Sequence, residues 1–196
     1  MKILRQLNEL KKYSSKIDLA SEKHKQPWKI LITTILSART KDETTIPVSI
    51  KLFSKYNALE KLSKANLKDI QEIIYPVNYY KNKSKYILKT SKLLVNKKIP
   101  LKLEKLIQLP GVGRKTANVF LLELGKNTIP VDTHLAYISQ KLNWTKNKKP
   151  ENIEEDLKKL FPKKYWSKLN STLVRFGKTY TSKKEKDKIL GKIKKI

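Results

Sequence analysis

The sequence predicts an all-α protein, and three observations carry that prediction. Apolar residues recur every three or four positions along most of the 196-residue chain, which is the spacing of one helix face. No alternating run of four to eight residues indicates a strand, and the best candidate, 128–131, is too short. Eight prolines divide the chain into short segments. We therefore expect about ten short helices joined by loops of ordinary length.

Apolar stripes mark most of the expected helices. In chain order the stripes lie at 3–10, 30–38, 87–94, 101–109, 119–124, 135–142, 157–160 and 169–174. The stripe at 119–124 is apolar on almost every side, which predicts a central, buried helix. The lysine-rich C-terminal segment 178–196 fits either a frayed basic tail or a short helix lying on DNA.

The charge of the chain indicates a polyanionic partner. The sequence has 45 basic residues against 17 acidic ones, a formal net charge of +28. Basic groups that neutralise phosphates release counterions, which gives salt-sensitive binding to nucleic acid. A lysine surface that only keeps the protein in solution is the alternative. The four arginines are therefore more informative than single lysines: Arg5, Arg39, Arg114 and Arg175.

The absence of cysteine excludes several classes of protein. A chain with no cysteine has no disulfide scaffold, thiolate zinc site, iron–sulfur cluster or cysteine nucleophile. Two histidines, His24 and His134, cannot build a histidine-rich metal centre, so we expect no cofactor. The charged N-terminus lacks the apolar region of a signal peptide, and no run reaches the ~18 apolar residues of a membrane span. We expect an intracellular monomer of the cytoplasm or nucleoid, without membrane contact.

The most informative stretch is 109–118, which reads Leu-Pro-Gly-Val-Gly-Arg-Lys-Thr-Ala-Asn. Gly111 and Gly113 permit positive φ and let the backbone approach a ligand closely. The first N–H groups of the helix that follows are unpaired and can bind an anion. Two helices joined in this way form a helix-hairpin-helix, which grips a DNA phosphate, so we expect DNA contacts from Gly111, Val112, Gly113 and Arg114. A plain turn with a glycine cap is the alternative.

Lys115 is the candidate nucleophile. It lies in the first turn of the second hairpin helix, where the positive helix end and the adjacent Arg114 both favour a neutral amine. A neutral amine can attack a carbonyl carbon and form a Schiff base. The alternative is that Lys115 is one more phosphate contact in a lysine-rich chain.

Asp132 is the candidate acidic partner. A short acidic side chain directly before an apolar helix, 135–142, predicts an N-cap residue, and capping is its alternative role. An ionised Asp132 can also stabilise a positive sugar centre or help to deprotonate an amine. His134 has an apolar next turn, which favours a structural role.

These residues resemble the endonuclease III family, within the helix-hairpin-helix DNA glycosylases. The hairpin at 109–118 is similar to the signature of that family, and 130–134, Pro-Val-Asp-Thr-His, matches its catalytic aspartate segment. Upstream, 36–42 resembles its Leu-Ser-x-x-Thr-x-Asp loop, and 78–84 resembles its Gly-x-Tyr-x-x-Lys-Ala turn. The resemblance covers residues from about 25 to 180.

The resemblance implies two helical lobes with a DNA-binding cleft between them. One lobe would span 22–131 and contain the hairpin at about 103–125, and the other would combine 1–21 with 132–196. The implied partner is double-stranded DNA containing damaged bases or abasic sites. The implied reaction belongs to base excision repair: the enzyme removes a damaged base, usually an oxidised pyrimidine, and then nicks the strand by β-elimination.

The resemblance also implies residue roles. Lys115 would attack C1′ of the sugar, and Asp132 would assist lysine activation and offset the developing positive charge. A lysine at this position implies lyase activity, because relatives without an amine there only remove the base. The further implied DNA-binding residues are Arg39, Thr40, Asp42 and Lys83.

Three departures from the family pattern stand out. The family usually ends with a four-cysteine loop that holds a [4Fe–4S] cluster, whereas 176–181 reads Phe-Gly-Lys-Thr-Tyr-Thr and the cluster must be absent. Arg39 stands where a glutamine wedge is common, and it either fills the gap left by an extruded base or contacts a phosphate. Asn78 replaces a turn glycine and tolerates the left-handed region.

Two other functions stay open. One is a non-catalytic helix-hairpin-helix protein that binds DNA and has lost its activity with the cluster. The other is a mismatch or other-lesion glycosylase of the same superfamily. Lys115 together with Asp132 favours an enzyme, because binding alone requires neither residue.

Overall fold

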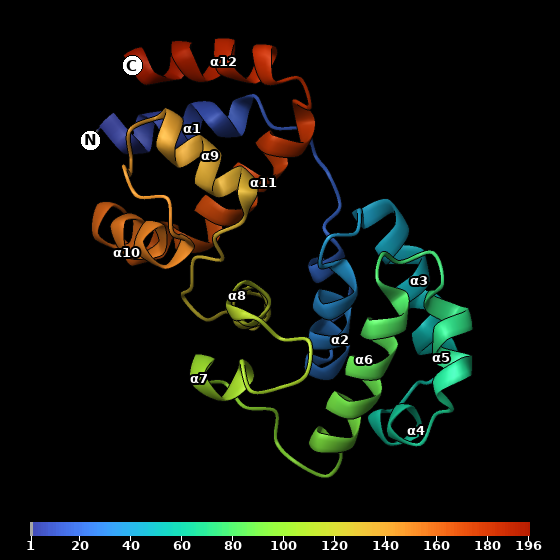
Figure 1. Ribbon diagram of the computed structural model, residues 1–196. Coiled ribbons are helices and arrows are strands. Elements are labelled where there is room, and N and C mark those ends of the chain that lie inside the picture. The colour runs from blue at the N-terminus through green and yellow to red at the C-terminus, as the bar shows by residue number, and fades with distance from the viewer. Residues whose placement is uncertain (1) are drawn as a thin grey trace. The chain divides into compact units, whose positions relative to one another are not determined.

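The computed structural model describes residues 2–196. These residues form helices joined by loops and contain no strand (Figure 1). The expected all-α class is therefore confirmed. The α-helices are α1 (Lys2–Lys12), α2 (Pro27–Ser37), α3 (Asp42–Lys55), α4 (Leu59–Ser63), α5 (Leu67–Ile74), α6 (Tyr80–Leu94), α7 (Leu103–Leu106), α8 (Arg114–Glu123), α9 (Thr133–Lys141), α10 (Pro150–Leu160), α11 (Trp166–Thr179) and α12 (Lys183–Lys195). The 3₁₀ helices are η1 (Ala20–Lys23) and η2 (Lys163–Tyr165). None of the helices in this part of the chain is long and apolar enough to cross a bilayer.

The chain forms two compact units. Unit 1 consists of Met1–Ile17 and Lys126–Ile196, and unit 2 consists of Asp18–Gly125. These limits differ from the expected ones, which fell after residues 21 and 131. The reason is packing: η1 contacts α2, α3 and α8 of unit 2, whereas Ile129 and Val131 are buried in the core of unit 1.

Helix α2 is the centre of unit 2. It begins at Pro27, whose fixed φ and missing N–H suit the first turn of a helix. Residues 30–36 are all buried, because α2 packs against α3, α6, α8 and η1. Helix α8 is buried along 116–121, as expected for the stripe at 119–124.

The helix before the hairpin is shorter than its apolar stripe predicts. The stripe at 101–109 predicts about two turns, whereas α7 spans only Leu103–Leu106. Leu106 is fully buried, but Leu101 and Ile107 are 49% and 47% exposed. The chain leaves the helix because the N–H of Leu109 bonds back to the Leu106 carbonyl and starts the hairpin turn.

Unit 1 contains α1 and the helices from α9 onward. Its core includes Leu10, Leu135, Leu173 and Phe176, none of which is exposed to solvent. Helix α11 contacts both α1 and α9. The two ends of the chain therefore fold together around one core.

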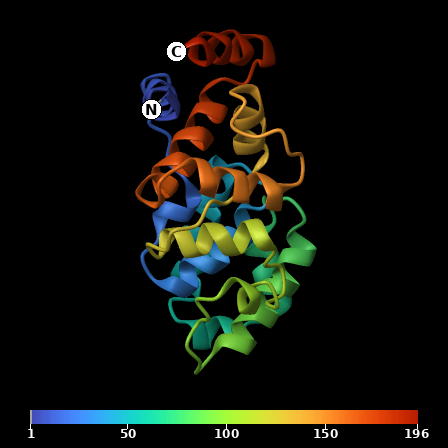
Figure 2. The same ribbon diagram turned by 90° about the vertical axis from the view of Figure 1, so that its left-hand side faces the viewer.

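The lysine-rich C-terminal segment is an ordered helix. Leu190 and Ile193 of α12 are 1% exposed, because they pack on α1 and α9, beside which α12 lies in both views (Figures 1 and 2). Gln6 of α1 donates from Nε2 to the Ile193 carbonyl at 3.3 Å and accepts at Oε1 from Trp144 Nε1 at 2.8 Å. The frayed tail is therefore wrong and the helix is confirmed, while its expected contact with DNA stays a prediction.

Candidate functional site

The first glycine of the hairpin turn is required by both conformation and space. Gly111 has φ +78°, and a Cβ there would lie 2.9 Å from Cβ and Cδ2 of Tyr86, closer than two carbon atoms approach. The hydroxyl of Thr90 donates to the Pro110 carbonyl at 3.0 Å. Tyr86 and Thr90 both belong to α6, so this helix fixes the shape of the turn.

The second glycine serves a different purpose. Gly113 has φ −86° and ψ 174°, an extended conformation that any residue can adopt. Gly113 therefore does not use the positive φ that glycine permits. No atom lies within 4 Å of a Cβ placed there. The missing side chain leaves open space beside the first turn of α8. This arrangement suits close approach by a ligand.

The backbone at the start of α8 offers donors to an anion. The N–H of Ala117 donates to the Gly113 carbonyl at 2.9 Å, so the N–H groups before it have no partner within the helix. The N–H of Val112 bonds to the Leu109 carbonyl at 3.1 Å, and its side chain is 4% exposed. Val112 therefore anchors the turn in the core of unit 2.

Lys115 is exposed in the first turn of α8, beside the half-buried Arg114. The next residues, Thr116 and Ala117, are buried against the core of unit 2. Lys115 is thus an exposed residue between the open space at Gly113 and the buried part of α8.

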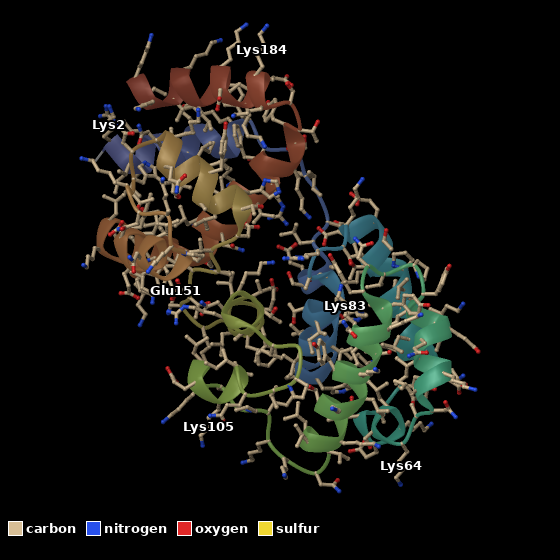
Figure 3. All side chains as sticks on the ribbon, viewed as in Figure 1. Lys2, Lys64, Lys83, Lys105, Glu151 and Lys184 are labelled. Carbon is tan, nitrogen blue, oxygen red and sulfur yellow. The ribbon has the colours of Figure 1, made fainter. Side chains whose placement is uncertain are left out.

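The loop after α2 is held by a buried lysine. Lys83 is 5% exposed, and its Nζ donates to the carbonyls of Leu36 and Ala38 at 2.6 Å each and to Oγ1 of Thr40 at 3.1 Å. Burial lowers the pKa of Lys83 to about 8. Figure 3 labels it on α6, beside α2. The expected DNA contact by Lys83 is wrong, because its ammonium group bonds to the loop from inside the protein. Thr40, which accepts one of these bonds, is half-buried.

Arg39 and Tyr79 form an exposed pair beside this loop. Both have left-handed backbones, with φ 55° and φ 60°. The Arg39 guanidinium carbon lies 5.8 Å from the centre of the Tyr79 ring, and its Nη1 donates to the Tyr79 hydroxyl at 3.4 Å. Tyr79 is 59% exposed. Sequence reasoning missed Tyr79, because it fills a variable position of the turn pattern.

Asn78 has another role than the expected one. The left-handed residue of this turn is Tyr79 rather than Asn78. The Asn78 side chain instead donates from Nδ2 to the Arg39 carbonyl at 2.6 Å. An amide therefore ties the turn before α6 to the loop after α2.

Asp42 also acts inside the protein. It is the first residue of α3 and is 8% exposed, and its Oδ1 accepts from the Ala20 N–H at 3.3 Å. A carboxylate in this place connects η1 to α3. It shapes the neighbouring loop, and direct contact with a phosphate would also be repulsive.

In unit 1, Asp132 is the N-cap residue of α9, as the sequence predicts. Its Oδ1 accepts from the Leu135 N–H at 2.8 Å, and the residue is half-buried. The ring of His134 fills the space in front of Gly177 on α11, where any Cβ would collide with it. This packing fits the structural role expected for His134.

The residues after α11 do not fit an iron–sulfur cluster. Cluster irons need thiolate ligands, and the sequence contains no cysteine. Within residues 2–196, no group of three or more histidine, aspartate or glutamate side chains could hold a metal ion. Where the cysteine loop would begin, α11 instead continues to Thr179 and a short connection leads into α12.

An all-α fold, a glycine turn before a helix with an exposed lysine, and a capping aspartate define a helix-hairpin-helix DNA repair enzyme. Residues 32–163 match the model of the HhH-GPD superfamily of base excision DNA repair proteins. The chain belongs to this superfamily.

Its relatives are endonucleases III. Endonuclease III of Thermotoga maritima is 42% identical over 162 residues, which cover 81% of this chain and 76% of that protein. Endonuclease III of Bacillus subtilis is 34% identical over 160 residues, 79% of this chain and 73% of that protein. A solved structure of a trapped endonuclease III–DNA covalent intermediate is 30% identical with a TM-score of 0.83 and covers 93% of this chain and 88% of that one.

These findings confirm the family resemblance and the enzyme class. The chain is a base excision repair DNA glycosylase with abasic-site lyase activity, and its partner is DNA. A thermostable thymine-DNA glycosylase of known structure is only 19% identical with a TM-score of 0.80, and it shares the fold.

Proposed function

We propose that this enzyme acts as a monomer on double-stranded DNA, removes an oxidised pyrimidine and cleaves the abasic site through Lys115. The observation that carries the proposal is the exposed Lys115 in the first turn of α8, directly after the glycine turn. A helix end of this kind binds a phosphate. The bound strand then lies beside an amine that can act as a nucleophile.

The first step is the displacement of the base. The amine of Lys115 attacks C1′, the glycosidic bond breaks, and its electron pair leaves with the base, which takes up a proton. The nitrogen now bonded to C1′ loses a proton. The C1′–O4′ bond then breaks, O4′ keeps its electron pair and takes up a proton, and the nitrogen lone pair forms the C1′=N bond of a protonated Schiff base. The carboxylate of Asp132 accepts a proton from the amine or stabilises the positive sugar centre.

The second step is strand cleavage. A proton leaves C2′, the electron pair forms a double bond between C2′ and C3′, and the 3′ phosphate departs with the electrons of the C3′–O bond. Water then hydrolyses the Schiff base, and the Lys115 amine is restored. No cofactor is required to balance these steps.

The exposed Arg39–Tyr79 pair supports base extrusion. An enzyme that flips a base out of the duplex fills the gap with inserted side chains. Arg39 is held over the Tyr79 ring, and a planar guanidinium and an aromatic ring both stack on bases. A phosphate contact by Arg39 is the competing role.

The test is borohydride trapping on a duplex with one abasic site. Wild-type enzyme should give a covalent adduct, and Lys115→Ala should give none. Lys105→Ala removes another exposed lysine, on α7, and should trap as wild type does. Asp132→Asn keeps an N-cap acceptor but removes the charge, and trapping should slow roughly 100-fold, within the range for loss of proton-transfer catalysis.

A wild-type enzyme that gives no adduct would contradict the lyase mechanism and favour a non-catalytic DNA-binding protein. A full yield from Lys115→Ala would contradict the assignment of the nucleophile. A panel of duplexes with oxidised pyrimidines, mismatches and alkylated purines tests the substrate, since release of mismatched bases alone would favour the mismatch glycosylase.

A further inference from the structure

Unit 1 contains a cationic feature beside Asp132. A cavity of about 240 Å³ lies between the first turns of α9 and the segment that leads into α12. We call it the α9–α12 pocket, and its lining residues are Thr133, His134, Tyr137, Ile138, Thr181, Lys183 and Lys186. Thr133 directly follows Asp132 in the chain, so the pocket adjoins the acidic residue of the proposed site.

The lining suits one anionic group. Two ammonium groups, Lys183 and Lys186, and two hydroxyls, Thr133 and Thr181, supply donors, while Ile138 is the apolar member. The volume is smaller than the roughly 300–1,000 Å³ of pockets for small molecules. A single phosphate group therefore fits the pocket better than a whole nucleotide or cofactor does.

Asp187, which directly follows the lining residue Lys186, is already engaged. Asp187 accepts from the Tyr137 hydroxyl and from Lys141 Nζ, the latter at 2.9 Å. These bonds lower the pKa of Asp187. Lys141 carries the ion pair with Asp187, and Lys183 contributes the smallest of the attractions to the same carboxylate, so this one carboxylate does not offset the charges of both Lys183 and Lys186.

Tyr137 also places Lys186. The Lys186 ammonium lies 5.8 Å from the centre of the Tyr137 ring, and Lys141 approaches the same ring at 5.5 Å. The ring face attracts a cation. Lys186 is half-buried, so its side chain is held at the pocket instead of extending freely into water.

We propose that the α9–α12 pocket binds a backbone phosphate of the substrate DNA. The segment 181–186 continues from 176–181, where the cysteine loop of the family would begin, so the lysines of this contact come from a part of the chain that differs from the family pattern. The inference rests on the proposed function, because it takes DNA to be the substrate and Asp132 to lie at the reacting sugar.

The test compares two charge-matched variants of α12. Lys183→Gln with Lys186→Gln removes the pocket lysines. Lys184→Gln with Lys188→Gln removes two exposed lysines of the same helix, and Figure 3 labels Lys184 on the outer side of α12. Each variant binds a duplex with a tetrahydrofuran abasic-site analogue at several salt concentrations, and thermal unfolding checks that both are folded.

The pocket variant should bind about tenfold more weakly, and the slope of log K against log salt should fall by about 1 to 2, as expected for lost phosphate contacts. The outer-face variant should bind within about twofold of wild type, since it keeps the pocket contact. Lys183→Arg with Lys186→Arg keeps both charges and should also bind as wild type does.

Equal weakening of both glutamine variants would show a general effect of charge and overturn the proposal, and so would unchanged binding by the pocket variant. Cleavage of a duplex with a natural abasic site is measured with the same protein preparations. Normal cleavage without pocket-dependent binding contradicts this inference alone. Pocket-dependent binding by a wild-type enzyme that neither cleaves nor traps contradicts the proposed function instead.

Discussion

Two irregular loops of unit 2 are held in shape by different physical means. The hairpin turn relies on a glycine, because Gly111 has φ +78° and no room for a side chain. The loop after α2 contains Arg39 at φ 55° and relies on polar cross-links from Lys83 and Asn78. A turn with glycine at its left-handed position is fixed by steric exclusion. A loop with a larger residue at such a position needs hydrogen bonds from neighbouring elements.

Helix α6 contributes support to both loops. Helix α6 provides Tyr86 and Thr90 to the hairpin turn, and Lys83 to the loop after α2. The last carbonyls of a helix have no intrahelical donor, and Lys83 satisfies that of Leu36 at the end of α2. Helix α6 therefore sets two surfaces on which the proposed function depends.

The largest loss of stability is expected when the loop after α2 loses the polar support of Lys83. Lys83→Met retains the buried chain but leaves the Leu36 and Ala38 carbonyls and the Thr40 hydroxyl without their donor. We expect the free energy of unfolding to fall by about 3 kcal/mol, because buried polar groups without partners cost about 1–3 kcal/mol each. Urea unfolding measures this change. Lys85→Met, at an exposed position of the same helix, is the control, and an equal loss in both variants would contradict the role of Lys83.

The two glycines of the hairpin should separate stability from function. Gly111→Ala places a Cβ against Tyr86 in a left-handed conformation, and we expect a loss of about 2 kcal/mol. Gly113→Ala meets open space in an extended conformation, and its stability should stay within about 0.5 kcal/mol of wild type. The new methyl group nevertheless occupies the approach to the α8 N–H groups, so DNA affinity should fall roughly tenfold.

Urea unfolding and binding to abasic-site analogue DNA are measured for both glycine variants. If Gly113→Ala binds DNA as wild type does, the phosphate does not approach α8 at this point. If Gly111→Ala is as stable as wild type, the turn is not fixed by sterics, and the contrast with the polar loop fails.

The sequence predicts those features that depend on local rules. The helical class follows from apolar spacing, the turn at Gly111 from its glycine, and the cap at Asp132 from a short acid before an apolar helix. The burial of Lys83, by contrast, depends on α2 and α6 packing together, and the sequence alone makes it one basic residue among 45. The ordered α12 is equally non-local, since Leu190 and Ile193 are buried only because α1 and α9 cover them.

The smallest expected effect is the pH dependence of the unfolding free energy that comes from Lys83 alone. Its pKa is lowered by burial to about 8 in the folded protein, against about 10.4 for an unperturbed lysine. Between these values the unfolded chain binds more protons than the folded one, so stability attributable to Lys83 rises with pH. Below pH 8 the lysine is protonated in both states, and this contribution does not vary.

We therefore expect the difference in unfolding free energy between wild type and Lys83→Met to grow in favour of wild type by roughly 1 kcal/mol from pH 7 to pH 9. The loss of charge from exposed lysines affects both proteins alike and cancels in the difference. Urea unfolding at four pH values measures it. A difference that stays constant, or that shrinks as the pH rises, would mean that the three accepting oxygens hold the ammonium as strongly as water does, despite its burial.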